Sequence, residues 1–205
     1  MRRKSLTKEK IAGEALKLID RVGLQGFSAR KLAARLKVQA MSLYHHFPSQ
    51  AHLLDAVMDQ LISGLPNPLD YPDTEENGLM VMRAYRDLAR RHPKFFPYVV
   101  MHRWNTPATL RYLEGLLSIY VREGFDMEMT VRLFRIFGYF LGGCAIEENA
   151  ELRSAAEPVS LDEQRVKFPL VYEAAPWFQG HRDDAFELGM KTLISSMKDL
   201  PRRAR

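Results

Sequence analysis

Residues 26–47 read GFSARKLAARLKVQAMSLYHHF, and this stretch decides the fold of the N-terminal part of the chain. Ser28 is suited to cap a short helix that runs to about residue 36, because its hydroxyl can accept a backbone hydrogen bond. A tight turn at Lys37-Val38 leads into a second short helix, from about residue 39 or 40 to 46. A small core can form between the two helices from Leu32, Leu36, Val38, Leu43 and Phe47. This pattern predicts a helix-turn-helix, in which one helix can lie in the major groove while the other crosses the DNA backbone.

The positive charge of the chain is concentrated in the same N-terminal part. Residues 1–47 hold eleven Lys and Arg against three acidic residues, a net charge of +8 in a chain whose total charge is +5. The rest of the chain is therefore mildly acidic. A compact basic unit is the electrostatic footprint of a protein that binds a polyanion, although a solvated charged surface has the same composition.

The remaining sequence also indicates helices separated by short breaks. Apolar residues between Ile11 and Val22 recur on one helical face, and Gly23 is suited to end that helix. Thr106-Pro107, Asp126 and Ser160 are start signals for later helices. The predicted helices cover about 7–22, 28–36, 39–46, 49–63, 75–91, part of 94–104, 106–123, 126–153, a short piece after 160, and 182–200. Loops are predicted at 65–73, 154–160 and 176–180.

These elements predict an all-α protein in two parts. Residues 1–48 form a three-helix, helix-turn-helix domain, and residues 49–205 form a larger helical domain. No long window alternates as a strand does, and the sequence contains no internal repeat.

Several classes of protein are disfavoured by what the sequence lacks. Cys144 is the single cysteine, so no intrachain disulfide or cysteine metal cluster can form, which fits a reducing compartment. We find no run of about 18 apolar residues and no signal peptide, and expect a cytoplasmic protein with no membrane contact. Catalytic and phosphate-binding motifs are missing, and His92 and His102 have no recognised metal spacing. We therefore expect no enzyme activity, no cofactor and no metal.

The helix-turn-helix segment resembles that of the TetR family. The matching residues are Ser28–Ala33 (SARKLA), Leu36–Val38 (LKV), Ser42–Phe47 (SLYHHF) and the pair Leu53-Leu54. The tail at 184–189 resembles the final dimerisation helix of the tetracycline-repressor-like subgroup. Two positions depart from the family pattern, since Lys37 replaces the turn glycine and Gln50 replaces a lysine that contacts phosphate.

The resemblance implies a set of DNA-contacting residues in this segment. Phosphate contacts are implied for Ser28, Lys31, Tyr44 and His46, and Lys37 could add another. Base contacts are implied for Arg30, Gln39, Ala40, Met41 and Ser42, with His45 at the edge. The chemistry agrees, because arginine bonds guanine edges, glutamine bonds adenine edges and apolar side chains fit thymine methyl groups. The alternative for Tyr44 is packing against the fourth helix, and for His45 and His46 a plain surface role. Residues 2–4 could form a mobile basic arm or a solvated terminus.

A regulator of this type binds DNA as a twofold dimer, because one recognition helix reads only a few base pairs. The long helix from residue 126 is apolar on two faces and is a candidate interface together with the last helix. The predicted interface residues are Val131, Gly138, Leu141, Gly142, Ala145, Phe186, Gly189 and Leu193. The alternative is that the long helix is an internal core helix.

Aromatic residues gather between positions 82 and 140, and we expect some of them to line a site for a hydrophobic or aromatic effector. The predicted effector-binding residues are Tyr85, Phe96, His102, Arg103, Trp104, Phe134 and Phe137. A plain hydrophobic core is the alternative. The sequence thus predicts a homodimeric repressor that binds a near-palindromic double-stranded operator and is released when effector binding shifts the fourth helix. A constitutive or architectural DNA-binding protein, or an activator, is the alternative.

Overall fold

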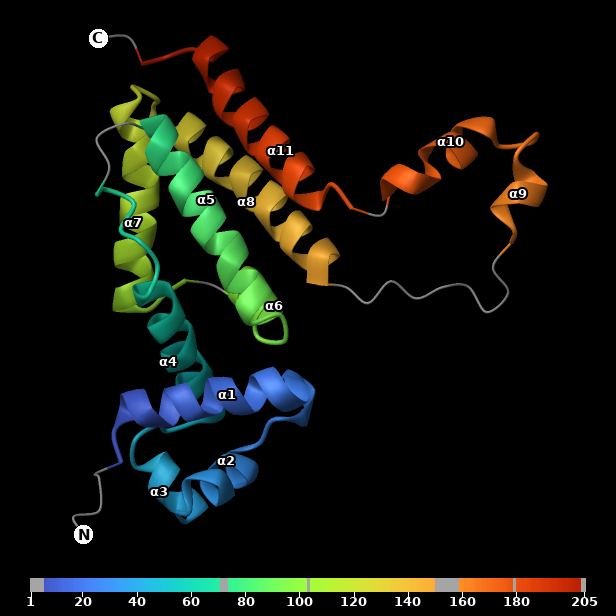
Figure 1. Ribbon diagram of the computed structural model, residues 1–205. Coiled ribbons are helices and arrows are strands. Elements are labelled where there is room, and N and C mark those ends of the chain that lie inside the picture. The colour runs from blue at the N-terminus through green and yellow to red at the C-terminus, as the bar shows by residue number, and fades with distance from the viewer. Residues whose placement is uncertain (1–5, 71–73, 103, 150–158, 179, 204–205) are drawn as a thin grey trace.

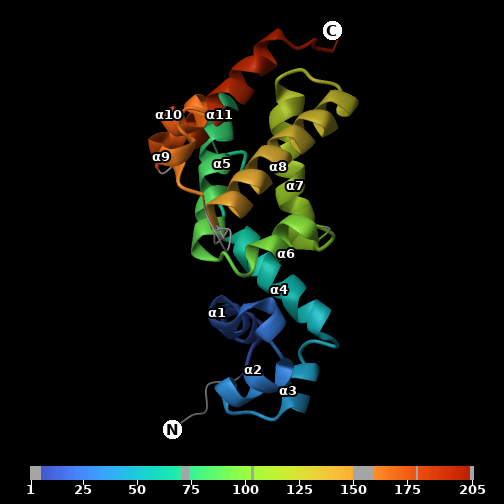
Figure 2. The same ribbon diagram turned by 90° about the vertical axis from the view of Figure 1, so that its right-hand side faces the viewer.

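The computed structural model describes residues 6–70, 74–102, 104–149, 159–178 and 180–203, and this part of the chain is helical without strands. A small N-terminal unit, the head, contains α1 (Lys8–Gly26), α2 (Ala29–Leu36) and α3 (Ala40–Tyr44) and lies at one end of an elongated molecule (Figure 1). α4 (Gln50–Ser63) leads from the head into a larger helical body (Figure 2). The all-α class and the order of its two parts are confirmed.

The body is a bundle from which an arm projects. It contains α5 (Thr74–Arg91), α6 (Phe96–Met101), α7 (Pro107–Arg122), α8 (Met127–Asn149) and α11 (Arg182–Ser196), followed by a 3-10 helix at Met197–Asp199. α5, α7, α8 and α11 pack side by side (Figures 1 and 2). α9 (Leu161–Gln164) and α10 (Pro169–Phe178) form the arm, which points away from the bundle in Figure 1.

Helix starts follow the capping residues that the sequence contains. The Thr106 hydroxyl accepts a hydrogen bond from the backbone N–H of Thr109 at 3.2 Å, and the Thr109 hydroxyl accepts one from the N–H of Thr106 at 3.1 Å. Asp126 Oδ1 accepts from the N–H of Met129 at 2.8 Å and so caps α8. Each cap satisfies a backbone donor that has no partner within its helix.

The helix ends differ from the sequence prediction at several places, and α3 and α11 both end earlier than predicted, at Tyr44 and Ser196. Gly23 adopts a left-handed φ of 76° and interrupts α1 as predicted, but a further helical turn continues to Gly26. α10 was not predicted as a separate helix, and it contains Pro176, where the sequence predicts a loop. Proline removes a backbone donor and usually breaks a helix interior, but here the helix ends two residues later at Phe178. Residues 150–153 of the predicted long helix and most of the loop at 154–160 lie outside the described residues.

The head and the body share one hydrophobic core. It runs from α1–α3 through α4 into α6 and α7, and Val57 and Met58 of α4 are fully buried within it. A second cluster lies between α5, α7, α8 and α11 around Phe137, Phe186 and Met190. α4 therefore joins the two parts through packing on both sides rather than acting as a free linker.

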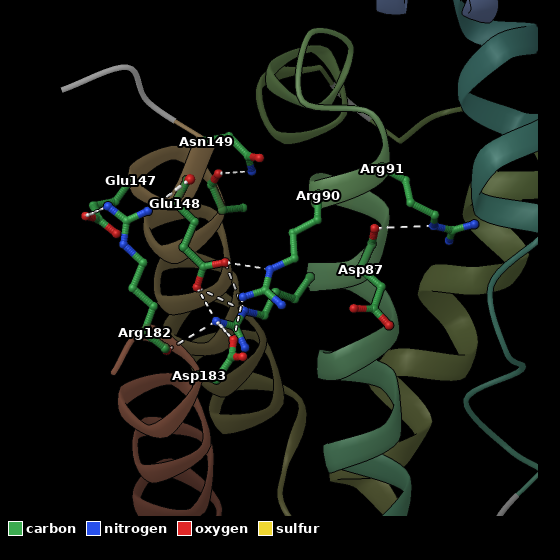
Figure 3. Close-up of polar contacts among 10 residues, drawn as sticks. Asp87, Arg90, Arg91, Glu147, Glu148, Asn149, Arg182 and Asp183 are labelled. Carbon is green, nitrogen blue, oxygen red and sulfur yellow. Dashed lines mark hydrogen bonds and ion pairs between the residues drawn. The ribbon is translucent and has the colours of Figure 1, made fainter. Parts of the chain in front are cut away.

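A network of ion pairs joins α5, α8 and the start of α11 (Figure 3). Arg86 Nη2 lies 2.6 Å from Glu148 Oε1, and both side chains are only 7% exposed. Arg90 contacts Glu148 at 3.1 Å and Asp183 at 2.5 Å. The guanidinium of Arg86 also lies 4.0 Å from the centre of the Phe186 ring. Arg86 and Glu148 each have a second partner in this network, which links the three helices through charged side chains.

α8 is the central helix of the body. By length and composition alone it could cross a membrane, although the sequence shows no uninterrupted apolar run of that length. Core helices of soluble proteins pass the same test. α8 packs against α5, α7 and α11, and we describe it as a helix of the bundle.

Candidate nucleic-acid interface and ligand cavity

Local hydrogen bonds build the turn between α2 and α3. The hydroxyl of Ser28 accepts a hydrogen bond from the N–H of Lys31 at 3.3 Å and caps α2. α2 ends at Lys37, whose φ of 56° and ψ of 44° lie in the left-handed region. The N–H of Val38 donates to the carbonyl of Ala33 at 3.0 Å and closes the turn. Lysine thus occupies a backbone conformation that favours glycine, at a cost of about 1 kcal/mol.

One face of α2 and α3 is buried and the other is open. Leu32, Leu43 and Phe47 pack into the core of the head. Met41 is 65% exposed and Tyr44 is 45% exposed, so neither side chain is absorbed by packing against α4. Of the predicted DNA-binding residues, the structure exposes Arg30, Lys31, Lys37, Gln39, Met41, Tyr44 and His45, and leaves Ser28, Ala40, Ser42 and His46 half-buried beside them.

Some basic side chains of the head form hydrogen bonds with other residues of the head. Lys31 Nζ donates to the carbonyl of Gly26 at 2.7 Å. Glu14 of α1 accepts from Lys17 at 2.8 Å and from Arg35 of α2 at 2.7 Å. Together these two hydrogen bonds hold the pKa of Glu14 below its usual value, and the bond from Lys17 makes the larger contribution. Arg35 therefore ties α2 to α1, while Arg30 projects from the exposed face. Residues 2–4, which the sequence suggests as a basic arm, lie outside the described residues.

The body encloses a cavity of about 470 Å³ between α5, α7, α8 and the C-terminal segment. Its volume is within the usual range for small-molecule sites. Six aromatic rings line it, together with aliphatic side chains and two glycines. The aromatic lining residues are Tyr85, Trp104, Tyr112, Tyr120, Phe134 and Phe137.

Four of the predicted effector-binding residues line this cavity: Tyr85, Trp104, Phe134 and Phe137. Two others do not. Phe96 is buried behind Tyr85, with the two rings edge to face at 4.9 Å between centroids. His102 stacks on Tyr98, on the side of α6 that faces α4. Arg103 lies outside the described residues. The sequence alone could not separate these cases, because α6 is apolar on the side toward α5 and on the side toward α4.

α7 contributes lining residues that the sequence analysis did not select. Tyr112, Leu116, Ile119 and Tyr120 all border the cavity. Their spacing along the chain is that of one helical face. That stripe is the signal that could have found them, but a stripe alone does not distinguish a cavity wall from a filled core.

The tyrosines of the cavity are neutral donors in an apolar setting. Burial raises the pKa of Tyr112 and Tyr120 above the usual phenol value. Burial first, and then the neighbouring Tyr112, raises the pKa of Tyr85. The hydroxyl oxygen of Tyr112 is buried and has no hydrogen-bond partner. A buried polar group without a partner is uncommon in native proteins and calls for a ligand or another explanation.

Charged residues stand only at the open end of the cavity. Lys198 Nζ lies 3.4 Å from Glu75 Oε2, and Arg202 Nη2 lies 4.0 Å from Glu123 Oε2. Arg202 also places its guanidinium 3.9 Å from the centre of the Phe125 ring. Both ion pairs connect the C-terminal segment to the helices that form the rim. Among the described residues, no group of three or more His, Cys, Asp or Glu side chains is arranged to hold a metal ion.

The predicted dimer residues differ in their exposure in the single chain. Gly138 and Leu141 line the cavity, and Gly142 lies against Val100. The buried ones are Gly142, Ala145 and Phe186, while Leu193 is partly buried and Val131 is exposed. A Cβ at Gly189 would lie 2.5 Å from the Phe140 ring, so this glycine permits contact within the chain.

Another side of α8 and α11 exposes apolar side chains beside charged ones such as Arg132 and Glu128. Tyr139 is 72% exposed, and the other exposed apolar residues of this face are Ile136, Ile146 and Leu188. The sequence shows that α8 is apolar on two faces, but the packing of α5 and α7 decides which one is buried. The predicted set is therefore divided between the interior and the surface: Val131 and Gly138 are exposed, and the others are partly or fully buried.

Two family models together match most of the chain. The model for bacterial regulatory proteins of the tetR family matches residues 11–57, which cover the helix-turn-helix and α4 up to Val57. The model for the tetracyclin repressor-like C-terminal domain matches residues 67–200, which include every helix that lines the cavity. The chain belongs to the TetR family. TetR regulators are DNA-binding transcription factors and not enzymes.

Individual relatives support the same assignment. An HTH-type transcriptional regulator of Saccharopolyspora erythraea is 34% identical, over 94% of this chain and 84% of that protein. The tetracycline repressor protein class A from transposon 1721 of Escherichia coli is 29% identical, over 89% of this chain and 86% of that protein.

Solved structures share the fold. ActR from Streptomyces coelicolor in complex with actinorhodin superposes with a TM-score of 0.77 at 22% identity, covering 96% of each chain. TetR from Acinetobacter baumannii superposes with a TM-score of 0.59 at 26% identity, covering 95% of this chain and 97% of that one. At 22% identity, the likeness to ActR establishes only that the two proteins share a fold.

Proposed function

We propose that this TetR-family protein is a repressor that binds a near-palindromic operator as a homodimer and is released by a small hydrophobic or aromatic effector. The cavity of about 470 Å³ carries the effector part of the proposal, because a constitutive or architectural DNA-binding protein has no use for it. Named relatives point the same way, since one is a tetracycline repressor and a fold neighbour was solved with actinorhodin. We place its action in the cytoplasm, where an operator is accessible.

The DNA-reading surface is the exposed face of α2 and α3. Arg30 and Gln39 are exposed and can bond base edges, while Met41 and Ala40 offer apolar contact to thymine methyl groups. Ser28, Lys31, Lys37, Tyr44, His45 and His46 surround them as candidate phosphate contacts and edge contacts. Residues 1–48 provide this surface and residues 49–205 the control domain.

The dimer forms through the uncovered apolar face of α8 and α11. Ile136, Tyr139 and Ile146 recur at helical spacing on α8, and Leu188 continues the face on α11. Large exposed apolar surfaces of this kind mark protein interfaces. The residues that the sequence predicts for the interface lie on the same two helices, and Val131 and Gly138 are the exposed ones among them. The full set is Val131, Gly138, Leu141, Gly142, Ala145, Phe186, Gly189 and Leu193.

The arm adds a second apolar surface that finds no cover in its own chain. Neither α9 nor α10 has a buried residue, and its exposed apolar side chains are Val166, Phe168, Leu170, Val171, Trp177 and Phe178. A partner subunit docked on α8 and α11 is the cover that we propose for this surface. We include packing of the arm on that partner in the proposal.

The cavity communicates with the head through α6 and α4. Tyr85 in the cavity wall contacts Phe96 at the start of α6. Further along α6, the hydroxyl of Tyr98 donates to Asp55 of α4 at 3.1 Å, and burial together with Asp55 raises the pKa of Tyr98 to about 12. Asp59 of α4 accepts a hydrogen bond from Thr106 at the start of α7. An effector that displaces Tyr85 would thus act on α4, which packs against α1.

A separate contact ties the head directly to the body. His92 Nδ1, in the turn after α5, lies 2.9 Å from Asp20 Oδ2 of α1, and Lys94 Nζ donates to the carbonyl of Arg21 at 2.8 Å. The orientation of α1 therefore depends on both α4 and the α5–α6 turn. Effector binding releases DNA if the effector binds more tightly to the orientation that does not fit the operator.

Selection of bound duplexes from a random DNA pool, followed by affinity measurements across salt, tests the proposed function. We expect a near-palindrome whose half-sites lie about 34–36 Å apart, which is one helical turn of DNA. Arg30→Ala should weaken operator binding by roughly 10- to 100-fold. Arg122→Ala, which removes an exposed arginine from the last turn of α7 in the body, serves as the matched control and should leave binding unchanged. Recovery of no motif, with binding that fades uniformly as salt rises, would contradict a sequence-specific regulator.

Effector control has its own measurement. Titration calorimetry of an aromatic effector in the presence and absence of operator should give different affinities, because coupling between two sites is reciprocal. Equal affinities would show that the cavity does not control DNA binding.

A further inference from the structure

The last described residues of the chain cross the open end of the cavity. Residues 197–203, which we call the C-terminal strap, follow α11 and lie at the end of the body away from the head (Figure 1). Met197, Lys198 and Arg202 of the strap line the cavity. The other sides of the rim come from Glu75 of α5 and Glu123 at the end of α7. The position of the strap therefore decides how wide the opening is.

Arg202 holds the end of the strap in place. Its guanidinium lies 3.9 Å from the centre of the Phe125 ring, which is buried in the turn between α7 and α8. Its Nη1 donates to the carbonyls of Met197 at 2.7 Å and Leu200 at 2.8 Å, and so fixes the bend of the strap. Glu123 Oε2 lies 4.0 Å from its Nη2. One side chain thus joins the strap both to itself and to the α7–α8 turn.

The attachments of the strap change in kind along its length. Met197 is buried in the second hydrophobic cluster, and Leu200 packs partly against it. Residues 201–203 have no regular secondary structure. Besides the contacts of Arg202, the backbone N–H of Arg203 donates to the carbonyl of Gly124 at 2.8 Å. The strap is therefore anchored by apolar packing up to Leu200 and mainly by Arg202 beyond it.

Opposite charges face each other across the rim. Lys198 Nζ lies 3.4 Å from Glu75 Oε2, and more than half of each side chain is exposed. An exposed ion pair of this kind contributes little to stability and separates easily. Movement of α5 or α7 would instead disturb helices that belong to the bundle core. The strap is the part of the rim that can move at the lowest cost in free energy.

We propose that the C-terminal strap is a gate of the cavity and that Arg202 holds the gate closed. Ligands enter and leave when Arg202 separates from the Phe125 ring and residues 201–203 move away from the α7–α8 turn. This inference rests on the proposed function, because it supplies the route to the proposed effector site. Since the gate lies at the end of the body away from the head, a ligand can enter while the head is bound to DNA (Figure 1).

A gate controls rates rather than affinity. If the strap opens more often, a ligand enters and leaves faster by the same factor, and its equilibrium affinity stays the same. A residue that contacts the bound ligand acts differently, because its removal mainly raises the dissociation rate. Kinetics therefore separate the two roles that Arg202 could have.

Stopped-flow binding of N-phenyl-1-naphthylamine to the full-length protein without DNA measures both rates. This dye is neutral and apolar, and its fluorescence rises when it leaves water. Arg202→Ala should raise the association and dissociation rate constants together by about tenfold, because it removes a cation–π contact and two hydrogen bonds from a charged donor. The equilibrium affinity for the dye should stay unchanged.

Three further variants make the result specific. Arg203→Ala removes the same charge one residue along the strap and keeps the backbone bond to Gly124, so both rates should stay unchanged. Glu123→Gln should raise both rates by a smaller factor than Arg202→Ala, because Glu123 is the more distant partner of Arg202. Leu116→Trp fills the cavity from α7 and should abolish the dye signal, which assigns that signal to the cavity.

Three outcomes would overturn the proposal. The first is unchanged rates in Arg202→Ala, which together with a lower unfolding temperature would give Arg202 a structural role alone. The second is a rise in the dissociation rate only, which would make Arg202 a ligand contact. The third is a dye signal that is absent from the unmodified chain or persists in Leu116→Trp, because the opening would then admit no apolar molecule of this size.

These measurements do not involve the operator, so they fail separately from the proposed function. Faster rates in Arg202→Ala together with failure of the operator selection would leave the gate in place and contradict the regulator. Recovery of the palindrome together with unchanged rates in Arg202→Ala would support the regulator and overturn the gate.

Discussion

The head and the body of this protein differ in how their interiors are filled. In the head, Ile11, Ile19 and Leu32 have no exposed surface and belong to a hydrophobic core shared by the three helices. In the body, six aromatic residues surround about 470 Å³ of empty space. Under the proposed function, the head needs a fixed shape to fit DNA. The body needs space for a ligand, so part of its possible packing energy is absent.

The largest expected effect concerns the buried ion pair of the body. Arg86 and Glu148 form a buried ion pair between α5 and α8, and Arg86→Leu would leave the carboxylate of Glu148 with only the partly exposed Arg90. We expect a loss of about 3–5 kcal/mol in the free energy of unfolding, measured with denaturant at fixed protein concentration.

The matched control for Arg86 lies one helical turn away on α5. Arg83 pairs with Glu187, and the side chains of these two residues are far more exposed. Arg83→Leu should therefore cost no more than about 1 kcal/mol. Equal costs for the two substitutions would mean that burial of the Arg86–Glu148 pair does not matter to the stability of the body.

A matched pair of leucine truncations sharpens the contrast between filled and hollow interiors. Leu32 of the head has no exposed surface, and Leu32→Ala should cost about 3–4 kcal/mol through lost contacts and a new cavity. Leu116 of α7 already borders empty space, so Leu116→Ala loses fewer contacts and should cost about 1–2 kcal/mol. Denaturant unfolding of both variants gives the comparison. If Leu116→Ala proved as costly as Leu32→Ala, Leu116 would have to pack closely against other atoms in solution.

A pair of glycine substitutions tests the close contact between α11 and α8 at Gly189. Gly189 of α11 faces the Phe140 ring, and an added methyl would lie 2.5 Å from it. Gly189→Ala should cost about 1–3 kcal/mol by overpacking. Gly13→Ala in α1 meets only the flexible Gln60 side chain at 3.6 Å and should stabilise by about 0.5–1 kcal/mol. Thermal unfolding that shows a gain at both positions would indicate that Phe140 moves aside freely.

The same contrast explains what the sequence could predict. The helix-turn-helix depends on local signals, namely the Ser28 cap, the turn at Lys37 and a short apolar stripe, and each acts within a few residues of its own position. The helix starts at Thr106 and Asp126 were predicted for the same reason. The fold class and family therefore followed from the sequence, and the exposed face of α2 and α3 agrees with the residues that the resemblance selects.

The body depends on packing between distant segments, and there the sequence was less informative. Phe96 and Tyr112 are both aromatic residues on apolar helix faces, yet Tyr112 borders the cavity and Phe96 lies behind its wall. Which face of α8 remains uncovered is likewise decided by α5, α7 and α11 together. Ala145 was predicted for the interface and is buried, whereas Tyr139, which was not selected, is exposed. No local signal carries that information.

The smallest expected effect concerns the one local position where the head departs from the family pattern. Lys37 holds a left-handed φ of 56°, which costs a residue with a Cβ about 1 kcal/mol. Lys37→Ala keeps this strain and removes the charge, whereas Lys37→Gly removes both. The glycine variant should therefore be more stable than the alanine variant by up to about 1 kcal/mol, after the larger chain entropy of unfolded glycine is set against it.

Operator binding by the same two variants separates the role of the charge from that of the backbone. If Lys37 contacts a phosphate, both variants should lose affinity equally, and the slope of log affinity against log salt should fall by about 0.9 in each. A slope that stays constant in both variants would mean that the lysine adds nothing to DNA binding and that its strain is uncompensated. A loss confined to the glycine variant would instead show that the left-handed residue stiffens the turn that positions α3.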